Sequence, residues 1–401
     1  MKTLVVNCGL SSLRYQLFDM KSQTIIAKGY ADHIGTAGSV LKHDAVGLGK
    51  ITIRSGLSNH AEAVKEMVSA LRDEDFGVVK DLGEMAAIGH RVVHGGEKFS
   101  DAVLISRDVL GAIKACVPLA PLHNPLNLMG IEASIGLFQG VPHVAVFDTA
   151  FHQTMPKHAY LYAIPYDYYE KHGIRSYGFH GLSHQFAAGR AERILGRPLQ
   201  DLRMVTIHLG NGCSITAVKG GQSVDTSMGM TPLNGLMMGQ RSGDIDPALI
   251  PLLAEMEKTD AAGVLDILNT RSGFMGVSGT SSDMVELERE VAEGRERSVV
   301  AHEMFCYRIK KYIGAYAASM GGLDAVVFTG GIGEHDPLVR SRACEGLEFM
   351  GVEIDGVCNA SPEPEKTISS ARSRVAVLVI PANEELVIAR ETVRVVGQAT
   401  S

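Results

Sequence analysis

Apolar and polar residues alternate in two stretches that each double back at a glycine-containing turn. The first runs from Leu4 to Asp19 and turns after Asn7, and the second runs from Val205 to Gly221 and turns at 210–212. Each pattern predicts a β-hairpin, because alternation is typical of half-buried strands and glycine permits a tight turn. Backbone N–H groups at such turns can bind an anion. Their recurrence in both halves predicts a duplicated architecture that faces a shared cleft.

Elsewhere, short apolar runs alternate with amphipathic helical patterns, which indicates an α/β protein. Further buried strands are expected at 86–94, 144–148, 324–329 and 375–380, the third followed by a glycine turn. Helices are expected after Ser58 or Asn59, from Asn124-Pro125 with the asparagine as cap, after Gly181, over 250–268 and 295–320, and from Glu385. The polar segment 225–247 reads as a loop around a site.

Carboxylate and amide side chains stand where predicted strands end. Asn7, Asp148 and Glu384 occupy such positions, and Asp225 is a weaker fourth candidate. Oxygen donors at strand ends suit Mg²⁺. Each residue alone is more often a turn or capping residue, but three at corresponding strand ends favour a metal site.

Two arginines lie beside glycine-rich loops, Arg91 inside an apolar strand and Arg241 in Arg-Ser-Gly-Asp. A guanidinium group pairs bidentately with phosphate or carboxylate. Isolated arginines are more often surface ion pairs, but a charge in a buried strand requires a partner. Among the histidines, His180 in Gly-Phe-His-Gly is the one expected to stabilise a developing charge.

Composition narrows the classes of protein. The chain has 401 residues, enough for two domains, and a formal charge of −7, which disfavours a nucleic-acid partner. Six cysteines without a Cys-x-x-Cys pair suggest reduced thiols and a cytoplasmic protein. We expect no signal peptide and no membrane span. The absence of a Gly-x-x-x-x-Gly-Lys motif excludes a P-loop nucleotide triphosphatase.

Long motifs along the whole chain resemble the acetate kinase family. They are Asn7-Cys-Gly-Leu-Ser-Ser-Leu-Arg14, His90-Arg-Val-Val-His-Gly-Gly-Glu97, Pro121-Leu-His-Asn-Pro125, Phe147-Asp-Thr-Ala-Phe-His-Gln-Thr-Met-Pro156, Tyr177-Gly-Phe-His-Gly181, His208-Leu-Gly-Asn-Gly212, Arg241-Ser-Gly-Asp244, Thr329-Gly-Gly-Ile-Gly-Glu334 and Asn383-Glu-Glu385.

The resemblance implies a two-domain actin-like ATPase fold with a duplicated βββαβαβα unit and an interdomain active-site cleft. Residues 1–149 with 385–401 would form the N-terminal domain, and 150–384 the nucleotide-binding and dimerisation domain. The implied reaction is reversible, direct in-line transfer of the γ-phosphoryl group of ATP to acetate, with Mg²⁺ or Mn²⁺, giving acetyl phosphate and ADP. A homodimer is implied, with no membrane partner.

The resemblance also assigns residues. Asn7 and Glu384 would serve the metal. The catalytic residues would be Asp148, Arg91, His180 and Arg241, of which Arg91 also binds substrate. The substrate site would further contain Val93, Leu122, His123, Phe179 and Pro232. The nucleotide site would contain Arg14, His208, Leu209, Gly210, Asn211, Gly212, Asp283, Met284, Val285, Gly331, Ile332, Gly333, Glu334 and His335.

Several positions depart from the family pattern. Leu10 replaces a serine of the first phosphate turn, and Val285 replaces an arginine of the nucleotide loop. Arg14 stands for a usual lysine, and His335 for a usual asparagine. None of these changes removes a metal or transition-state group, so we expect catalysis with weaker or altered nucleotide selection.

Two alternatives remain open. A propionate kinase would perform the same chemistry with a roomier pocket, although Val93 favours a small acyl group. A non-catalytic nucleotide-binding protein of the actin-like fold would bind ATP without forming an acyl phosphate.

Overall fold

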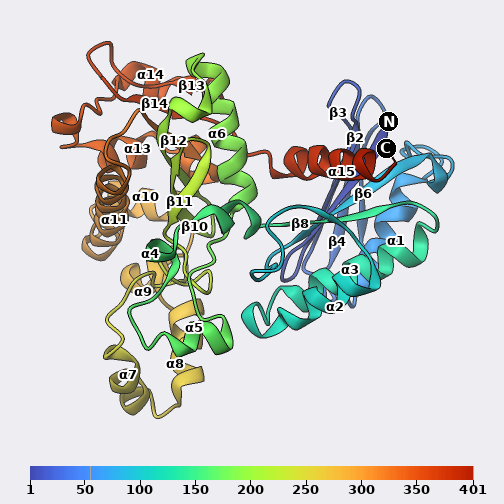
Figure 1. Cartoon of the computed structure of the whole chain (residues 1–401), viewed down its shortest axis with the longest axis horizontal. Coiled ribbons are helices and arrows are strands. Elements are labelled where there is room, and N and C mark those ends of the chain that lie inside the picture. The colour runs from blue at the N-terminus through green and yellow to red at the C-terminus, as the bar shows by residue number, and fades with distance from the viewer. Residues whose placement is uncertain (55, 401) are drawn as a thin grey trace. The chain divides into compact units, whose positions relative to one another are not determined.

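The structure, a computed structural model, describes residues 1–54 and 56–400 (Figure 1). The strands are β1 Lys2–Cys8, β2 Leu13–Asp19, β3 Thr24–Asp32, β4 Val40–Ala45, β5 Gly49–Arg54, β6 Met85–Val92, β7 Val103–Leu104, β8 His143–Phe147, β9 Arg203–Leu209, β10 Cys213–Lys219, β11 Gln222–Thr226, β12 Ala325–Thr329, β13 Lys366–Thr367 and β14 Ala376–Val379. The α-helices are α1 His60–Leu71, α2 Arg107–Ala115, α3 Asn124–Leu137, α4 Lys157–Tyr160, α5 Asp167–His172, α6 Gly181–Leu195, α7 Leu249–Glu257, α8 Ala261–Thr270, α9 Gly273–Ser278, α10 Met284–Ala292, α11 Glu296–Met320, α12 Gly330–His335, α13 Pro337–Cys344, α14 Gly356–Ala360 and α15 Glu384–Thr400. Short 3₁₀ helices are Leu82–Glu84, Val117–Leu119, Ala150–Thr154, Leu199–Asp201 and Glu348–Met350.

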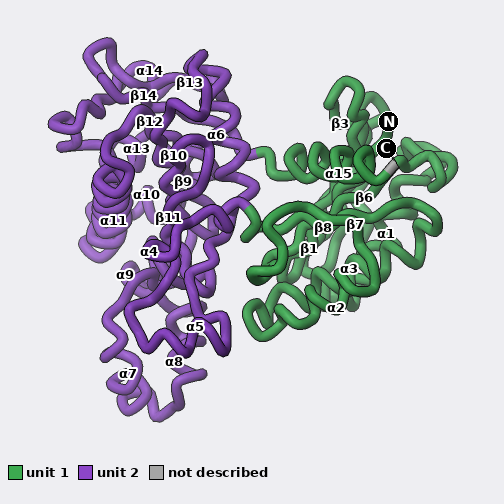
Figure 2. Tube along the Cα trace, viewed as in Figure 1, with its two compact units in different colours: residues 1–150, 383–401 green, residues 151–382 purple. Residues whose placement is uncertain are grey.

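The chain divides into two compact units, shown in separate colours in Figure 2. Unit 1 comprises Met1–Ala150 and Asn383–Ser401, and unit 2 comprises Phe151–Ala382. Each contains one sheet with strands and helices interleaved, so the predicted α/β class is confirmed.

Unit 1 is built on a sheet of strand order β5-β4-β3-β2-β1-β6-β8-β7. The strands β1 to β5 pair antiparallel in sequence order, whereas β1, β6 and β8 run parallel. The predicted first hairpin is confirmed, and its register places Asn7 opposite Arg14. Because β1, β6 and β8 are parallel neighbours, their carboxyl ends meet at one edge of the sheet.

Helices cover both faces of this sheet (Figure 1). Leu4, Val6 and Cys8 of β1 pack into a core with residues of α1 such as Val64 and Met67. The opposite face carries α15, which approaches β6 so closely at Gly89 that an added Cβ would lie 2.7 Å from Ile388. Alternation along the strands therefore separates the two cores, as the side-chain period of two requires.

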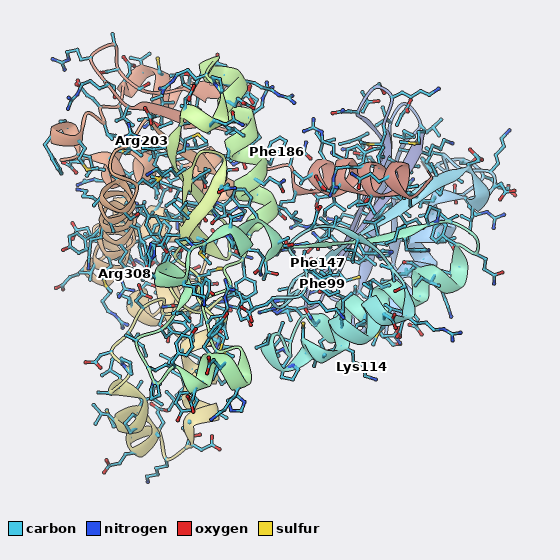
Figure 3. All side chains as sticks on the ribbon, viewed as in Figure 1. Phe99, Lys114, Phe147, Phe186, Arg203 and Arg308 are labelled. Atoms are coloured by element: carbon cyan, nitrogen blue, oxygen red, sulfur yellow. The ribbon has the colours of Figure 1, made fainter. Side chains whose placement is uncertain are left out.

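The loop that follows β6 packs over a pair of stacked aromatic rings. The rings of Phe99 and Phe147 lie 4.4 Å apart with an interplanar angle of 7°, and Figure 3 shows the two side chains together. A Cβ at Gly95 would lie 2.8 Å from the ring of Phe147, so only glycine fits there. This contact fixes the path of the loop directly after Arg91.

Unit 2 is built on a sheet of strand order β11-β10-β9-β12-β14-β13. The second predicted hairpin is confirmed by the antiparallel pairing of β9 and β10, and β12 runs parallel to β9 and β14. Small residues of α6, including Ala187, Ala188 and Ala191, pack on the sheet, and the long helix α11 also contacts β9 and β10. At the start of β9, Arg203, labelled in Figure 3, donates to Asp324 at 3.0 Å.

Three predictions of local secondary structure are wrong. The expected helix over 250–268 is two helices, because Lys258 is left-handed (φ 53°) and Asp260 caps α8 by accepting from Gly263 N. Asn124 does not cap α3: it is the first helical residue, and its buried side chain bonds the backbone of His94. The glycines after β12 form the helix α12, not a turn.

In the part of the chain that the structure describes, every cysteine is free, and no helix has the length and apolar character needed to cross a membrane.

The close approach of α15 to β6 predicts opposite effects at two glycines of unit 1. Gly89→Ala should destabilise the protein by about 1–3 kcal/mol, because its Cβ would meet Thr392 Oγ1 at 2.3 Å. The matched control, Gly136→Ala in α3, has open space around its Cβ and should stabilise by about 0.5–1 kcal/mol through helix propensity. Urea unfolding of both variants measures these changes. Equal midpoints for the two variants would contradict the packing.

Candidate functional site

Unit 1 gathers its charged side chains where β1, β6 and β8 end and α15 begins. Arg91 donates Nε and a terminal nitrogen to the two carboxylate oxygens of Asp148, at 2.9 and 2.5 Å. The remaining terminal nitrogen donates to Asn7 Oδ1 at 3.3 Å. Burial opposes the charge on Arg91, but Asp148 and Glu384 outweigh it and raise the pKa of the guanidinium group. Arg91 is therefore a fixed cation inside the sheet edge.

The same edge carries more negative than positive charge. Burial raises the pKa of Glu384, an effect that Arg91 opposes and Asp148 reinforces. Burial and the neighbouring Glu384 also raise the pKa of Glu385. Three carboxylates thus face the guanidinium groups of Arg91 and Arg14. Carboxylate and amide oxygens with a surplus of negative charge fit a hard divalent cation, which would relieve this repulsion.

The loop after β6 is held by two amide side chains, of which the sequence analysis missed Asn127 and interpreted Asn124 only as a helix cap. Asn127 Oδ1 accepts from Val93 N at 3.0 Å, and its Nδ2 donates to Cys8 O at 2.9 Å. Asn124 Oδ1 accepts from His94 N at 3.1 Å. Both residues are buried on α3. The sequence signal that could have revealed them is an asparagine on the helix face that is expected to be buried, because a buried amide needs polar partners.

In unit 2, His180, Gly212 and Arg241 converge. His180 precedes α6 in a left-handed conformation (φ 57°), and its ring centroid lies 4.3 Å from that of His208. A Cβ at Gly212 would lie 3.1 Å from His180 Cε1 and 3.5 Å from a terminal nitrogen of Arg241. Glycine at 212 therefore lets the β9–β10 turn approach the side chains of His180 and Arg241.

Arg241 is a mostly buried cation without an acidic partner. It donates to Pro232 O at 3.2 Å and contacts Met238 Sδ at 3.7 Å, and no carboxylate of the described residues lies within ion-pair distance of it. Burial lowers the pKa of its guanidinium group. Because an uncompensated buried charge is costly, this arrangement calls for an anionic ligand.

A buried network behind His180 was not predicted. Ser214 Oγ lies 2.9 Å from His180 Nδ1 and 2.7 Å from His184 Nε2, and His184 Nδ1 lies 2.8 Å from Thr206 Oγ1. Burial, together with His152 and His208, lowers the pKa of His184 well below its usual value, so this ring is neutral. The network therefore orients the His180 ring through Nδ1.

The expected nucleotide segments lie on neighbouring elements of unit 2. Thr329 at the end of β12 pairs with His208 at the end of β9, and a Cβ at Gly330 would lie 2.7 Å from Leu209 O. The segments 208–212 and 331–335 are therefore adjacent. Asp283 accepts from the backbone of Val285 and Glu286 and so caps α10, while the Val285 side chain is 75% exposed.

The remaining expected site residues are distributed between the units. Arg14 lies on β2 of unit 1, with its guanidinium group 5.4 Å from the Tyr30 ring centroid. Val93 is buried and Leu122 is 61% exposed, both in unit 1 with the half-buried His123. The other two apolar positions, the buried Phe179 and half-buried Pro232, belong to unit 2.

Asp225, the weaker fourth candidate for an oxygen ligand, lies in β11 of unit 2, whereas Asn7, Asp148 and Glu384 belong to unit 1. Burial raises the pKa of Asp225 from 3.8 to about 6, against opposing effects of the Thr226 N–H and His158. The folded state therefore binds this proton more tightly than the unfolded state. Stability should fall as pH rises from about 4 through about 6.

Asp225→Asn should remove this loss of stability. We expect the variant to exceed the wild type by about 1–3 kcal/mol at pH 8 and by much less at pH 4, where the carboxyl group is protonated in the folded state and partly protonated in the unfolded state. Guanidinium chloride unfolding at the two pH values measures the difference. A difference independent of pH would show that Asp225 is not a buried titrating group.

Comparisons with known proteins identify the family of this chain. A model of the acetokinase family matches residues 2–390. The acetate kinase of Alkaliphilus metalliredigens is 55% identical over 392 residues, covering 98% of this chain and 99% of the relative. Crystal structures of Porphyromonas gingivalis acetate kinase (TM-score 0.93, 47% identity) and of a propionate kinase from Francisella tularensis (TM-score 0.92, 41% identity) each match 98% of this chain and 99% of theirs. The chain therefore belongs to the acetokinase family.

Proposed function

We propose that the protein is an acetate kinase, which reversibly transfers the γ-phosphoryl group of ATP to acetate by direct in-line transfer and forms acetyl phosphate and ADP. Family membership and the 55% identity to an acetate kinase over nearly the whole chain support this proposal. The same resemblance supports a homodimer in the cytoplasm, and sedimentation equilibrium would report the dimer mass.

Acetate, the proposed phosphoryl acceptor, has to be bound but does not have to be activated. Acetate is ionised at neutral pH, so no general base has to create the nucleophile, and the barrier arises from bringing two anions together. Arg91 is the acetate-binding cation of unit 1, because its charge is fixed by Asp148 at 2.9 and 2.5 Å. Val93, Leu122 and His123, with Phe179 and Pro232, contribute the surroundings of the methyl group.

Asn7 and Glu384 are the proposed ligands of Mg²⁺ or Mn²⁺. Asp148 is linked to Asn7 by Arg91, which bonds both residues, and Asp148 is close enough to Glu384 to raise its pKa. When bound, the ion neutralises charge on the phosphate oxygens. Asp148 orients Arg91, and this pairing of a carboxylate with a guanidinium group fits a positioning role better than a role in proton transfer.

The donor side is assigned to unit 2. Transition-state charge on the transferring group spreads over its equatorial oxygens, which cations stabilise. Arg241 and His180 supply these donors, and the turn 208–212 with segments 283–285 and 331–335 binds the nucleotide. Because Val285 is exposed and uncharged, this chain lacks one cation that relatives would offer to ATP.

The observation that carries the proposal is the mostly buried Arg241, which lies beside His180 and Gly212 and has no carboxylate partner among the residues that the structure describes. Elsewhere in unit 2, arginines such as Arg190 and Arg203 pair with Glu365 and Asp324. A buried guanidinium group whose anion is missing is what a phosphoryl-binding site requires.

Acetyl phosphate trapped as its hydroxamate tests this assignment. The wild type with ATP, acetate and Mg²⁺ should form hydroxamate, and Arg241→Gln should lower kcat by about 10²–10³-fold, as expected for loss of one transition-state donor. Arg372→Lys, at an exposed arginine, is the control and should retain activity. Wild-type ATP binding without hydroxamate would instead support a non-catalytic nucleotide-binding protein.

Propionate kinase is the second candidate, because a propionate kinase from Francisella tularensis matches this chain with a TM-score of 0.92. The two substrates differ by one methylene group, which a pocket discriminates by only about 1–3 kcal/mol, or roughly 10–200-fold in kcat/KM. We expect kcat/KM to fall from acetate to propionate to butyrate, because Val93 is buried and its backbone is fixed by Asn127. A larger kcat/KM for propionate would reassign the substrate.

A further inference from the structure

Three potential metal ligands meet in unit 2 outside the set of oxygen ligands assigned to Mg²⁺. Glu288 lies on α10, His302 on α11, and Asp336 between α12 and α13. Each offers one ligand atom, and these atoms all lie within 4.8 Å of one another. His302 is 4% exposed and Asp336 is 6% exposed, so two of the three are almost completely buried.

His302 and Asp336 each have one buried polar atom that forms no hydrogen bond with the described residues. His302 Nδ1 lies 3.9 Å from Cys306 Sγ, and Nε2 is buried without a hydrogen-bond partner among the described residues. Asp336 Oδ1 accepts from Val339 N at 2.8 Å, and Oδ2 likewise has no partner in this part of the chain. Buried polar atoms nearly always have a hydrogen-bond partner, so two such atoms without one in the same cluster indicate a missing ligand.

The charges around the cluster point to a cation. Glu288 and Asp336 are both acidic, and their side chains lie within hydrogen-bonding reach of each other. Two arginines are nearby but engaged: Arg340 donates to Asn359 and to the carbonyls of Gly333 and Glu334, and Arg342 lies 3.8 Å from Glu345. Glu303 adds a further negative charge beside His302.

We propose that Glu288, His302 and Asp336 bind one divalent transition-metal ion of the Zn²⁺ class. An imidazole nitrogen with two carboxylate oxygens is a donor set that Zn²⁺ accepts readily and that Mg²⁺, which prefers oxygen and water, does not. A tetrahedral ion with ligands at about 2.1 Å places ligand atoms about 3.4 Å apart, so only a small closure of the side chains is needed.

The ion would link two segments of the proposed nucleotide site. Asp336 directly follows the segment 331–335, and Glu288 lies one turn of α10 beyond the segment 283–285. A metal shared by both would hold α10 against α12 and α13. Its role is therefore structural, and its existence does not depend on the proposed reaction.

Zinc titration of the chelator-treated, full-length protein tests the site, with millimolar Mg²⁺ present to occupy hard oxygen ligands. The wild type should bind one Zn²⁺ per chain and gain thermal stability. His302→Gln and Glu288→Gln should each weaken Zn²⁺ binding at least tenfold. The control His172→Gln removes an exposed histidine of the same unit and should bind Zn²⁺ like the wild type. Equal affinities in all four proteins would overturn the proposal.

A second measurement does not depend on the folding of variants. Crystals of the wild type soaked in Zn²⁺ should show an anomalous difference peak between Glu288, His302 and Asp336. A peak only beside Asn7 and Glu384, or only on surface histidines, would refute the site. Because neither experiment measures phosphoryl transfer, an inactive enzyme would leave this inference intact. An active enzyme that binds no Zn²⁺ at Glu288, His302 and Asp336 would refute this inference and leave the proposed function standing.

Discussion

A buried guanidinium group at the end of a parallel strand is the constraint on which unit 1 depends. Arg91 cannot leave the sheet without breaking β6, and it cannot remain there without an anion, because an unpaired buried charge is strongly destabilising. Asp148, which follows the adjacent parallel strand β8, meets this need with two hydrogen bonds. The pairing fixes both residues and leaves Glu384 and Glu385 with excess negative charge.

Unit 2 also contains a largely buried arginine, but its surroundings differ from those of Arg91. Arg241 is largely buried, but it bonds a backbone carbonyl and contacts a sulfur atom, and it pairs with no carboxylate within residues 1–54 and 56–400. One unit therefore carries surplus negative charge and the other an uncompensated positive charge. In the proposed reaction between two anions, a divalent ion would offset the negative charge of unit 1, and Arg241 of unit 2 would bind a substrate anion.

Neutral groups hold these charges in place. Asn124 and Asn127 bond the backbone of the loop after β6, and Ser214 with His184 fixes the ring of His180. None of them carries a charge, so they orient the site without changing its electrostatic balance. Their hydrogen bonds join residues between 30 and 34 positions apart. Such pairs are invisible to any reading of local sequence pattern.

Sequence patterns predicted the elements well wherever local periodicity decides them. Both hairpins, the long helix α11 and the strand β8 that precedes Asp148 follow directly from apolar spacing. Predictions failed where one residue can adopt two structural roles. Asn124 was expected to cap a helix, but its amide bonds His94, and Lys258 interrupts a helix by adopting a left-handed conformation.

The sequence by itself determined the α/β class, the family and the identity of the charged residues, because motifs and periodicity are properties of neighbouring positions. The tertiary structure decided which charges find partners: Arg91 with Asp148, and Arg241 with no carboxylate among the described residues. It also brought Glu288, His302 and Asp336 together from three separate elements. Burial and pairing depend on contacts across the fold, and linear spacing does not contain them.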